Sequence, residues 1–301
     1  MPNLKDIKNR IQSIRNTKKI TRAMKMVAAA KVKKAETSVK SSRPFSGELT
    51  VMFQKMLYAS SGELHYESQK YARALDNFPA LLGKRSIKTE GLIVITSNKG
   101  LAGAYNANII RAALKRIENN SSNGIGTLLY IAGQKGISAL QRKTDTEISK
   151  KYVAAADNPT ASNAGIIAED MAEDFVSEKI DRTVIITTRF NNMMSYTVKE
   201  QQVLPVVFDK PAQGMDALME FVPDRAAILQ KIVPLYITNT IFQSLLEASA
   251  SELASRMTAM SAASKNAEEM INNLTVSYNK ARQGAITQEL IEIVSGASAQ
   301  K

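Results

Sequence analysis

The sequence predicts an α/β protein in which long helices at both termini flank a small central domain. Apolar residues keep helical spacing over more than fifty residues at each end, and short β-branched runs alternate with helical stretches in between. The 301 residues include no cysteine and a single histidine. These counts exclude a disulfide scaffold, a thiolate zinc site, a cysteine nucleophile and a two-histidine metal site.

The first segment, residues 1–60, is expected to form one long helix of a coiled coil. Its apolar residues recur at alternating spacings of three and four, and then continue with a phase shift. They are Leu4, Ile7, Ile11 and Ile14, followed by Ile20, Met24, Val27 and Ala28. Pro44 should bend or interrupt the helix, because its ring removes a backbone hydrogen bond. A continuous helix over residues 4–58 would be about 80 Å long.

The last segment, residues 213–301, is expected to form the partner helix. Its apolar residues follow a heptad-like rhythm, and they are Ile228, Ile232, Leu235, Phe242, Leu246, Leu253, Met260, Ala267, Ile271, Leu274, Tyr278 and Ala281. The positions skipped in the series hold Asn239, Ser249 and Ser264, so the seam is narrow and buries little apolar area. Pro234 is expected to mark a first turn or a kink. The two terminal helices pair most simply as an antiparallel coiled coil.

The central segment, residues 61–212, is predicted to be a small α/β (Rossmann-like) domain with helices on both sheet faces. Three β-branched runs are typical of buried parallel strands, namely 91–96, 127–132 and 183–188. Helical stretches are expected at 105–117, 134–142 and 162–176, a further extended pair or edge strand at 192–207, and a turn-rich loop at 119–126. Residues 208–224, with two prolines and Gly214, are expected to lead into the last helix.

Positive charge is concentrated at the N-terminus. The chain carries a net charge of +12, and residues 1–40 hold nine Lys and three Arg against Asp6 and Glu36. Such an arm can meet nucleic acid, anionic lipid or an acidic protein surface, and the alternative is a solvated helix face. No apolar run approaches the roughly 20 residues of a membrane-spanning helix.

The sequence contains no strong motif for catalysis, nucleotide binding or metal binding. Residues 97–103 (SNKGLAG) follow a strand and open a helix, but their glycine spacing matches neither a phosphate loop nor a dinucleotide fingerprint, so a tight turn is the better interpretation. His65 lies in a polar stretch and is interpreted as a surface residue. Glu169, Asp170, Glu173 and Asp174 are interpreted as the solvated stripe of an amphipathic helix. We therefore expect no catalytic residues, no bound nucleotide, no metal and no cofactor.

The C-terminal end of the chain is unusually apolar. Aliphatic residues cover much of the circumference of a helix that ends a few residues later: Ala285, Ile286, Leu290, Ile291, Ile293 and Val294. Exposed termini are normally polar. The helix either enters a socket in a partner or folds back on the protein's own core, and periodicity does not separate the two.

Four segments resemble the gamma subunit of F-type ATP synthases. They are KITRAMKMVAAAK (19–31), SNKGLAGAYNANI (97–109), SELASRMTAM (251–260) with NAEEMI (266–271), and ARQGAITQELIEIVSGA (281–297). The second departs from the family, which often has an acidic residue near Asn98 and Cys-Gly-Gly at 102–104. The resemblance runs through the whole chain in the family's order.

The resemblance implies a central rotor shaft that couples proton-driven rotation of the c-subunit ring to conformational changes in the beta catalytic sites. The implied partners are the alpha and beta subunits, epsilon and the c ring, with membrane contact only through partners. The implied location is the cytoplasmic face of a bacterial plasma membrane, since the start of the chain aligns with the family's mature beginning. The absence of cysteine excludes the thiol control of the plastid form.

Family contact positions transfer to eight residues of this sequence as partner contacts with the alpha and beta subunits: Met24, Lys25, Arg256, Arg282, Gln283, Thr287, Gln288 and Glu289. Two other functions compete with the rotor shaft. A basic coiled-coil protein could bind nucleic acid, although basic recognition helices normally adjoin a parallel dimeric zipper. A nucleotide-using α/β enzyme would need a phosphate loop of the right spacing, which is missing.

Overall fold

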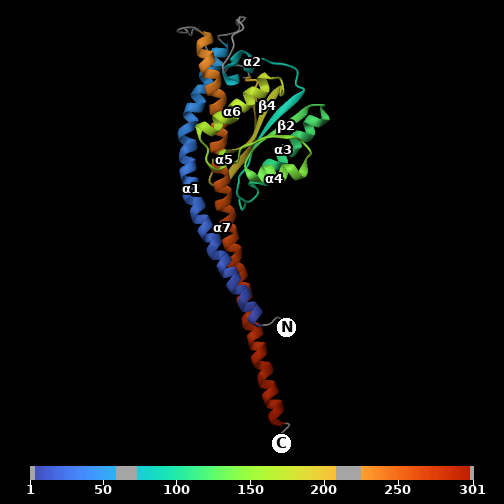
Figure 1. Ribbon diagram of the computed structural model, residues 1–301. Helices are drawn as coiled ribbons and strands as arrows, with labels where there is room; N and C mark the ends of the chain where they lie inside the picture. The colour runs from blue at the N-terminus through green and yellow to red at the C-terminus, as the bar shows by residue number, and fades with distance from the viewer. Residues whose placement is uncertain (1–3, 59–72, 208–224, 299–301) are drawn as a thin grey trace. The chain divides into compact units, whose positions relative to one another are not determined.

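A computed structural model describes residues 4–58, 73–207 and 225–298 of the chain. The protein divides into two compact units, which we call the coil unit (Met1–Ala30 with Arg256–Lys301) and the sheet unit (Lys31–Ser255). Two long helices, α1 (Leu4–Tyr58) and α7 (Arg225–Ser298), contribute to both units (Figure 1). Two positions named above, His65 and the segment 208–224, lie outside the described residues.

The sheet unit is built on a five-stranded sheet in the order β3-β2-β1-β4-β5. Its strands are β1 (Thr89–Ile95), β2 (Gly126–Ala132), β3 (Ile148–Lys151), β4 (Arg182–Asn192) and β5 (Ser195–Leu204). The first four are parallel, and β5 pairs antiparallel with β4 at the edge. The predicted strands and edge strand are confirmed. The short β3 was not predicted, since its four residues include two exposed lysines and no apolar run.

Helices cover both faces of this sheet (Figure 1). On one face, α3 (Tyr105–Ser122) and α4 (Gln134–Lys143) pack on alternate residues of the strands, such as Leu92, Leu129 and Ile186. Helix α3 includes residues 119–122, so the predicted loop at 119–126 is wrong there. The asparagines and serines continue the helix because Asn120 is buried and bonds to the sheet.

The other face carries the larger apolar core. Helix α6 (Ala161–Val176) packs there with parts of α1 and α7, and the short elements η1 (Ala74–Asp76), α2 (Phe78–Leu82) and α5 (Val153–Asp157) close its margins. Phe53 of α1 meets Tyr236 of α7, with ring centroids 4.9 Å apart. The two helices run antiparallel here, since Ser42 bonds to Gln243 and Asn239 to Ser46. The expected fold class is confirmed.

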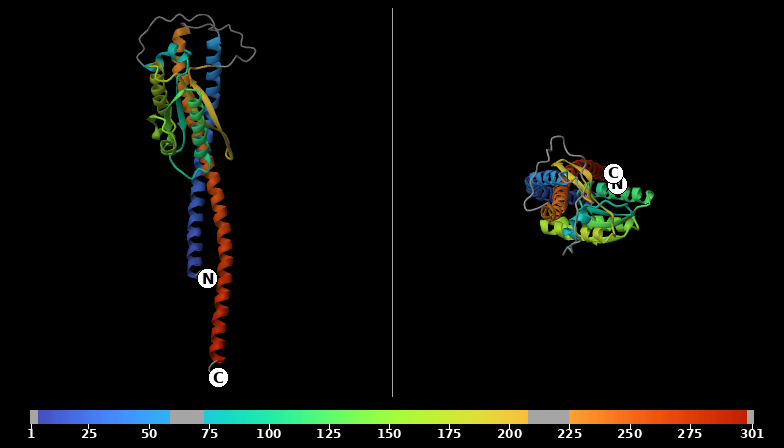
Figure 2. Two further views of the ribbon diagram at one scale, coloured as in Figure 1. Left: turned by 90° about the vertical axis from the view of Figure 1, so that its right-hand side faces the viewer. Right: turned by 90° about the horizontal axis from the view of Figure 1, so that it is seen from above.

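The coil unit is an antiparallel pair formed by the first half of α1 and the second half of α7 (Figures 1 and 2). Its seam is narrow, as the small residues of α7 predicted. Buried positions on α1 are Ile7, Ile11, Thr21 and Ala28, and those on α7 are Met260 and Ala267. Lys18 pairs with Glu268 at 3.0 Å. Few large side chains are buried, so each turn gains little from the hydrophobic effect.

Three apolar residues assigned to the seam lie outside it. Ile20 is 61% exposed, Val27 is 56% exposed, and Leu235 is also exposed. The predicted phase shift in α1 is wrong, because the buried residues Ile7, Ile11, Thr21 and Ala28, together with the half-buried Ile14, Lys18 and Met24 between them, keep spacings of three and four. A threonine and an alanine suffice in a seam where helices approach closely.

Neither proline interrupts its helix. Pro44 lies inside α1 and Pro234 inside α7, so an interruption at the first and a first helical turn at the second are wrong, whereas a bend at Pro44 and a kink at Pro234 stay predictions. Strong tertiary packing on either side of each proline keeps the helix continuous despite the lost hydrogen bond. Over the part of the chain that the structure describes, none of the helices combines the length with the hydropathy that a membrane span requires.

Candidate partner-contact surface

All eight contact residues expected from the sequence lie in the coil unit. Met24 is half-buried at the edge of the α1 seam and Lys25 beside it is exposed. On α7, Arg256 is half-buried and interacts with the protein, whereas Arg282, Gln283, Thr287, Gln288 and Glu289 are exposed. The structure does not gather these residues into one cluster. Those of α7 are spread over about 50 Å of helix.

Within the described part of the coil unit, the last turns of α7 have no helix beside them. In Figure 2, α7 continues past the N-terminal end of α1, and the side chains from Arg282 to Ser295 are exposed apart from Ala285, which is half-buried. The exposed set includes five large aliphatic residues: Ile286, Leu290, Ile291, Ile293 and Val294. None of these five side chains is buried against the described residues of the coil unit. Of the two interpretations, the socket in a partner remains.

Two hydrogen bonds of polar side chains in the tip are local. The Thr287 hydroxyl donates to the Gln283 carbonyl at 2.9 Å, and the Gln288 amide donates to Glu292 Oε1 at 3.0 Å. Both are exposed contacts within one helix, worth about 1 kcal/mol or less. Such groups can exchange these bonds for bonds to a partner at small cost.

A second apolar surface lies on α1 and was missed by sequence reasoning. Ile20, Met26 and Val27 are all more than half exposed, within about two turns of helix. The seam of α1 repeats every three or four residues, and this spacing places Ile20 and Val27 on the outer side of the helix. The sequence interpretation assumed a phase shift instead and therefore put both residues in the seam. This exposed group flanks Met24 and Lys25, so the contact region on α1 is broader than those two residues.

The outer surface of α1 in the coil unit is also basic. Exposed cations follow its length: Lys8, Arg10, Arg15, Lys19, Arg22 and Lys25. Lys18, by contrast, forms an ion pair with Glu268 inside the coil unit. Surface cations of this kind contribute little to folding. They are therefore available to an acidic partner surface, which they would attract over about 8–10 Å at physiological salt.

The turn after β1 is filled by protein groups rather than left open for a phosphate. The segment opens α3, and there Tyr105 N donates to the Ala102 carbonyl oxygen at 3.1 Å and Ser97 N donates to Asn106 Oδ1 at 3.0 Å. The N-terminus of the neighbouring α4, where an anion could also bind, packs against the segment, and its Gln134 N donates to Asn98 Oδ1 at 2.8 Å. Gly133 has a φ of +105°, and a Cβ there would lie 2.3 Å from the Thr96 carbonyl oxygen. The segment packs as a tight strand-to-helix turn, as predicted.

Helix α7 also closes the end of this turn. The Ser255 hydroxyl donates to the Ala102 carbonyl oxygen at 2.6 Å, and Tyr105 beneath it is buried. Burial, with the nearby charge of Glu252, raises the pKa of the Tyr105 hydroxyl far above its usual value. A neutral, buried phenol at the carboxyl ends of β1 and β4 occupies the crevice in which α/β sheets commonly bind ligands.

The acidic residues of α6 are not a uniform solvated stripe. Asp170 accepts hydrogen bonds from the Tyr152 hydroxyl at 2.7 Å and from Lys150 at 3.2 Å. Asp174 bonds to the Tyr130 hydroxyl and pairs with Lys179 at 3.5 Å. These two aspartates fasten α6 to β2 and β3. Among the described residues, no three acidic or histidine side chains gather into a possible metal site.

Comparison with known proteins gives a consistent result. The family model described as ATP synthase matches residues 3–300. The chain is 41% identical to an ATP synthase gamma chain of Synechococcus and 40% identical to that of Nostoc punctiforme, with 99% of each chain covered.

Solved structures with a similar fold come from ATP synthase rotors. One, the central stalk and c ring of the Tetrahymena thermophila mitochondrial enzyme, contains a chain 29% identical, with a TM-score of 0.60 over 81% of this chain and 99% of that one. A chain of the Euglena gracilis mitochondrial enzyme is 19% identical, with a TM-score of 0.69 over 99% of this chain and 94% of that one. The protein thus belongs to the family of ATP synthase gamma chains.

Proposed function

We propose that this protein is the central rotor shaft of an F-type ATP synthase and transmits rotation of the c-subunit ring to the catalytic sites of the beta subunits. The observation that carries the proposal is the tip of α7, an exposed apolar helix that continues beyond its partner α1. In a family whose relatives are gamma chains, this helix fits a socket in the ring of alpha and beta subunits. The shaft itself is not catalytic.

Transmission of torque requires an interface that holds and then slips. A continuous apolar interface would stall, because each step would expose its whole area to water. The exposed polar residues Arg282, Gln283, Thr287, Gln288 and Glu289 can instead each form a single, exchangeable hydrogen bond to the partner. We assign these five residues, together with Met24, Lys25 and Arg256, to contacts with the alpha and beta subunits.

The basic outer surface of α1 would face acidic loops of the ring. A nucleic-acid-binding coil is disfavoured, because the basic stretch pairs antiparallel with a helix of its own chain and does not fork from a parallel dimer. The sheet unit would carry the epsilon subunit and rest on the c ring, in line with neighbours solved as central stalk and c-ring assemblies. We place the chain at the cytoplasmic face of a bacterial plasma membrane, held there through these partners.

The domain limits follow from the same proposal. Residues 1–60 and 213–301 supply the two helices of the shaft, and residues 61–212 supply the domain that meets epsilon and the c ring.

Reconstitution tests the proposal directly. Alpha and beta subunits mixed with the full chain should hydrolyse ATP steadily at a rate well above that of the mixture without it, because only an asymmetric shaft imposes different conformations on the three beta sites. A mixture that contains a chain ending at residue 281 serves as the control for the tip and should lose most of the gain. Equal rates with and without the full chain would overturn the rotor assignment.

A further inference from the structure

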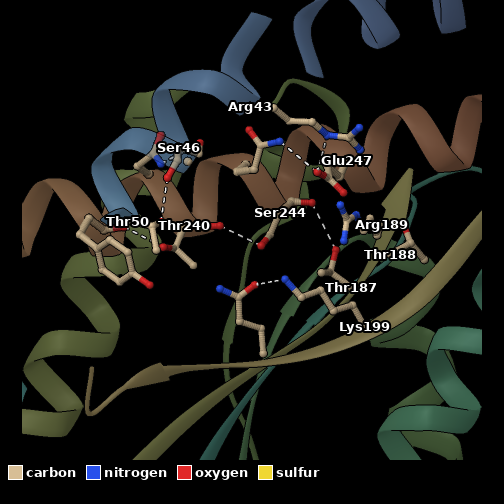
Figure 3. Close-up of a pocket in the computed structure, with 15 residues that line it drawn as sticks. Arg43, Ser46, Thr50, Thr187, Thr188, Arg189, Lys199, Thr240, Ser244 and Glu247 are labelled. Carbon is tan, nitrogen blue, oxygen red and sulfur yellow. Dashed lines mark hydrogen bonds and ion pairs between the residues drawn. The ribbon is translucent and has the colours of Figure 1, made fainter. Parts of the chain in front are cut away.

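A polar groove lies in the sheet unit, between the exposed end of β4–β5 and the two long helices (Figure 3). Its volume is about 440 Å³, within the range of small-ligand sites. Closer to the centre of the sheet, the same face is filled by apolar side chains such as Ile185, Val203 and Ile241. The groove is therefore a distinct feature of the polar end and not a defect in the apolar packing.

Three cationic side chains border the groove, one from each of three elements. Arg43 comes from α1, Arg189 from β4 and Lys199 from β5, and a single carboxylate, Glu247 of α7, accompanies them. A second hollow of about 530 Å³ is bordered by the same three cations. The local charge is thus positive on both sides of the β4–β5 edge.

Both carboxylate oxygens of Glu247 already accept hydrogen bonds from the protein. Its Oε1 accepts from Arg43 Nε at 3.2 Å and from Gln243 Nε2 at 3.0 Å, and its Oε2 accepts from the Phe190 amide at 3.2 Å. Arg43 also donates to the Phe190 carbonyl oxygen at 2.6 Å. Glu247 therefore neutralises and fixes Arg43, and the charges of Arg189 and Lys199 remain. Neither of these two forms an ion pair with a described residue.

Arg189 and Lys199 are placed so that they can converge on one group. In the ladder, Thr187 lies opposite Lys199 and Arg189 lies two residues further along the same strand face. Diagonal neighbours of this kind have Cα atoms about 7–8 Å apart. Burial lowers the pKa of Lys199, and the charge of Arg189 lowers it further, although Glu247 opposes both. Arg189 and Lys199 repel each other, Glu247 offsets this only in part, and a bound anion would reduce the remaining repulsion.

Most of the other polar groups of the groove are used by the protein, whereas the buried Thr188 Oγ1, which also borders the groove, has no hydrogen-bond partner among the described residues. The hydroxyls of Thr50, Thr187, Thr240 and Ser244 donate to backbone carbonyl oxygens, and Lys199 donates to the neutral Gln201 amide at 2.7 Å. What the groove offers a ligand is therefore mainly the N–H groups of its cations. A phosphate suits them, because it presents several oxygens that a guanidinium and an ammonium can share.

We propose that this groove binds a soluble small molecule that carries phosphate groups, with Arg189 and Lys199 as its ligands and with Arg43, held by Glu247, at the side of the site. The site lies wholly in the sheet unit and is independent of the torque contacts in the coil unit.

Calorimetric titration of the full chain with pyrophosphate at fixed ionic strength tests the proposal. We expect saturable binding at one site, about tenfold weaker in Arg189→Gln and in Lys199→Gln, since each loses a charge-assisted bond, and absent in the double variant. Lys115→Gln, on the exposed surface of α3, removes the same charge elsewhere and should bind as the unaltered chain does. No saturable binding, binding that survives in the double variant, or equal weakening in the control would overturn the proposal.

Labelling of lysines with a small amine-reactive reagent locates the site independently of folding. Pyrophosphate should slow modification of Lys199, read by peptide mass spectrometry, and leave Lys115 unchanged. Unaltered labelling of Lys199 would contradict the proposal even if some binding is measured.

Sedimentation with phosphatidylglycerol vesicles distinguishes a soluble phosphate compound from a lipid headgroup as the ligand. Vesicle binding that the double variant loses would assign the groove to a lipid headgroup and overturn the soluble ligand.

Discussion

Helix α7 has two different environments along its length. In the sheet unit it is surrounded, and Leu229, Ile237 and Leu245 are almost wholly buried in the core shared with α6 and the sheet. In the coil unit it touches one helix, buries mainly Met260 and Ala267, and then continues as an exposed tip. The comparison shows that α7 is helical both where its side chains are buried and where they are exposed. The sheet unit stabilises itself, whereas the tip carries apolar surface that folding of the chain does not use.

The sheet unit also buries charge, which the coil unit does not. Glu90 is fully buried and accepts hydrogen bonds from Arg116, Arg182 and Asn120. Burial alone would raise the pKa of Glu90, but the bonds and charges of these neighbours keep it below its usual value. In the coil unit, the pair Lys18–Glu268 is largely exposed and is worth little.

The largest difference is expected when one substitution is made at two places on α7. Leu245→Ala, at a site only 2% exposed, should lower the free energy of unfolding by about 2–5 kcal/mol through lost burial and a residual cavity. Leu290→Ala, at 56% exposure, should change it by less than about 0.5 kcal/mol. Urea unfolding of both variants measures this. Equal losses would show that the tip is packed in the free chain.

The next effect concerns the two acidic partners of Arg116. Glu90→Ala should cost about 3 kcal/mol, because it leaves two largely buried arginines without their carboxylate. Glu200→Ala removes an exposed contact of 3.3 Å and should cost less than about 1 kcal/mol. Urea unfolding measures both costs, as shifts of the denaturation midpoint at an unchanged dependence of the free energy of unfolding on urea concentration. A similar cost for both would mean that burial of Glu90 does not matter.

A smaller, pH-dependent effect is expected at Asp181. Burial tends to raise its pKa, but the amides of Thr89 and Lys88 and the Arg85 guanidinium together hold it below the usual value. A carboxyl with a depressed pKa stabilises the fold above its unfolded pKa of about 4, and this stabilisation is lost as the pH falls through the folded pKa.

Asp181→Asn should therefore lower stability by about 1.5–3 kcal/mol at pH 7 and by progressively less below about pH 4. Asp145→Asn, at an exposed position, is the matched control. Thermal unfolding between pH 2 and pH 7 follows both. An Asp181→Asn variant that keeps the full acid sensitivity of the unaltered chain would refute the prediction.

The smallest effect on the folded chain, and the largest on coupling, is expected at the half-buried Met24. Met24→Lys adds charge beside an already basic surface, so it should loosen the coupling of hydrolysis to proton pumping in the reconstituted enzyme more than it impairs assembly. Met194→Lys, at an 87% exposed position in the sheet unit, makes the same change elsewhere. Normal pumping at normal hydrolysis in the Met24 variant would count against the contact assignment.

Much of the fold followed from local pattern. The β-branched runs at 91–96, 127–132 and 183–188 are strands because such residues pack well on both faces of a buried sheet, and the turn at 97–103 is confirmed. The short β3 and α5 were missed, since four or five residues carry no period that stands out. The buried side of α1 was predicted less well. Ile20 and Val27 were assigned to the seam because they are apolar, but register decides which side of a helix is buried.

By itself, then, the sequence determined the order of the elements, the basic surface of α1, the weak seam and the apolar tip. These depend on residue type and spacing, which are local properties. Only the tertiary structure decided that the side chains of the tip are exposed, that α7 closes the ligand crevice of the sheet, and that Arg43, Arg189, Lys199 and Glu247 meet at one groove. Those four residues come from four elements up to two hundred positions apart, and no local pattern specifies which distant side chains will share a surface.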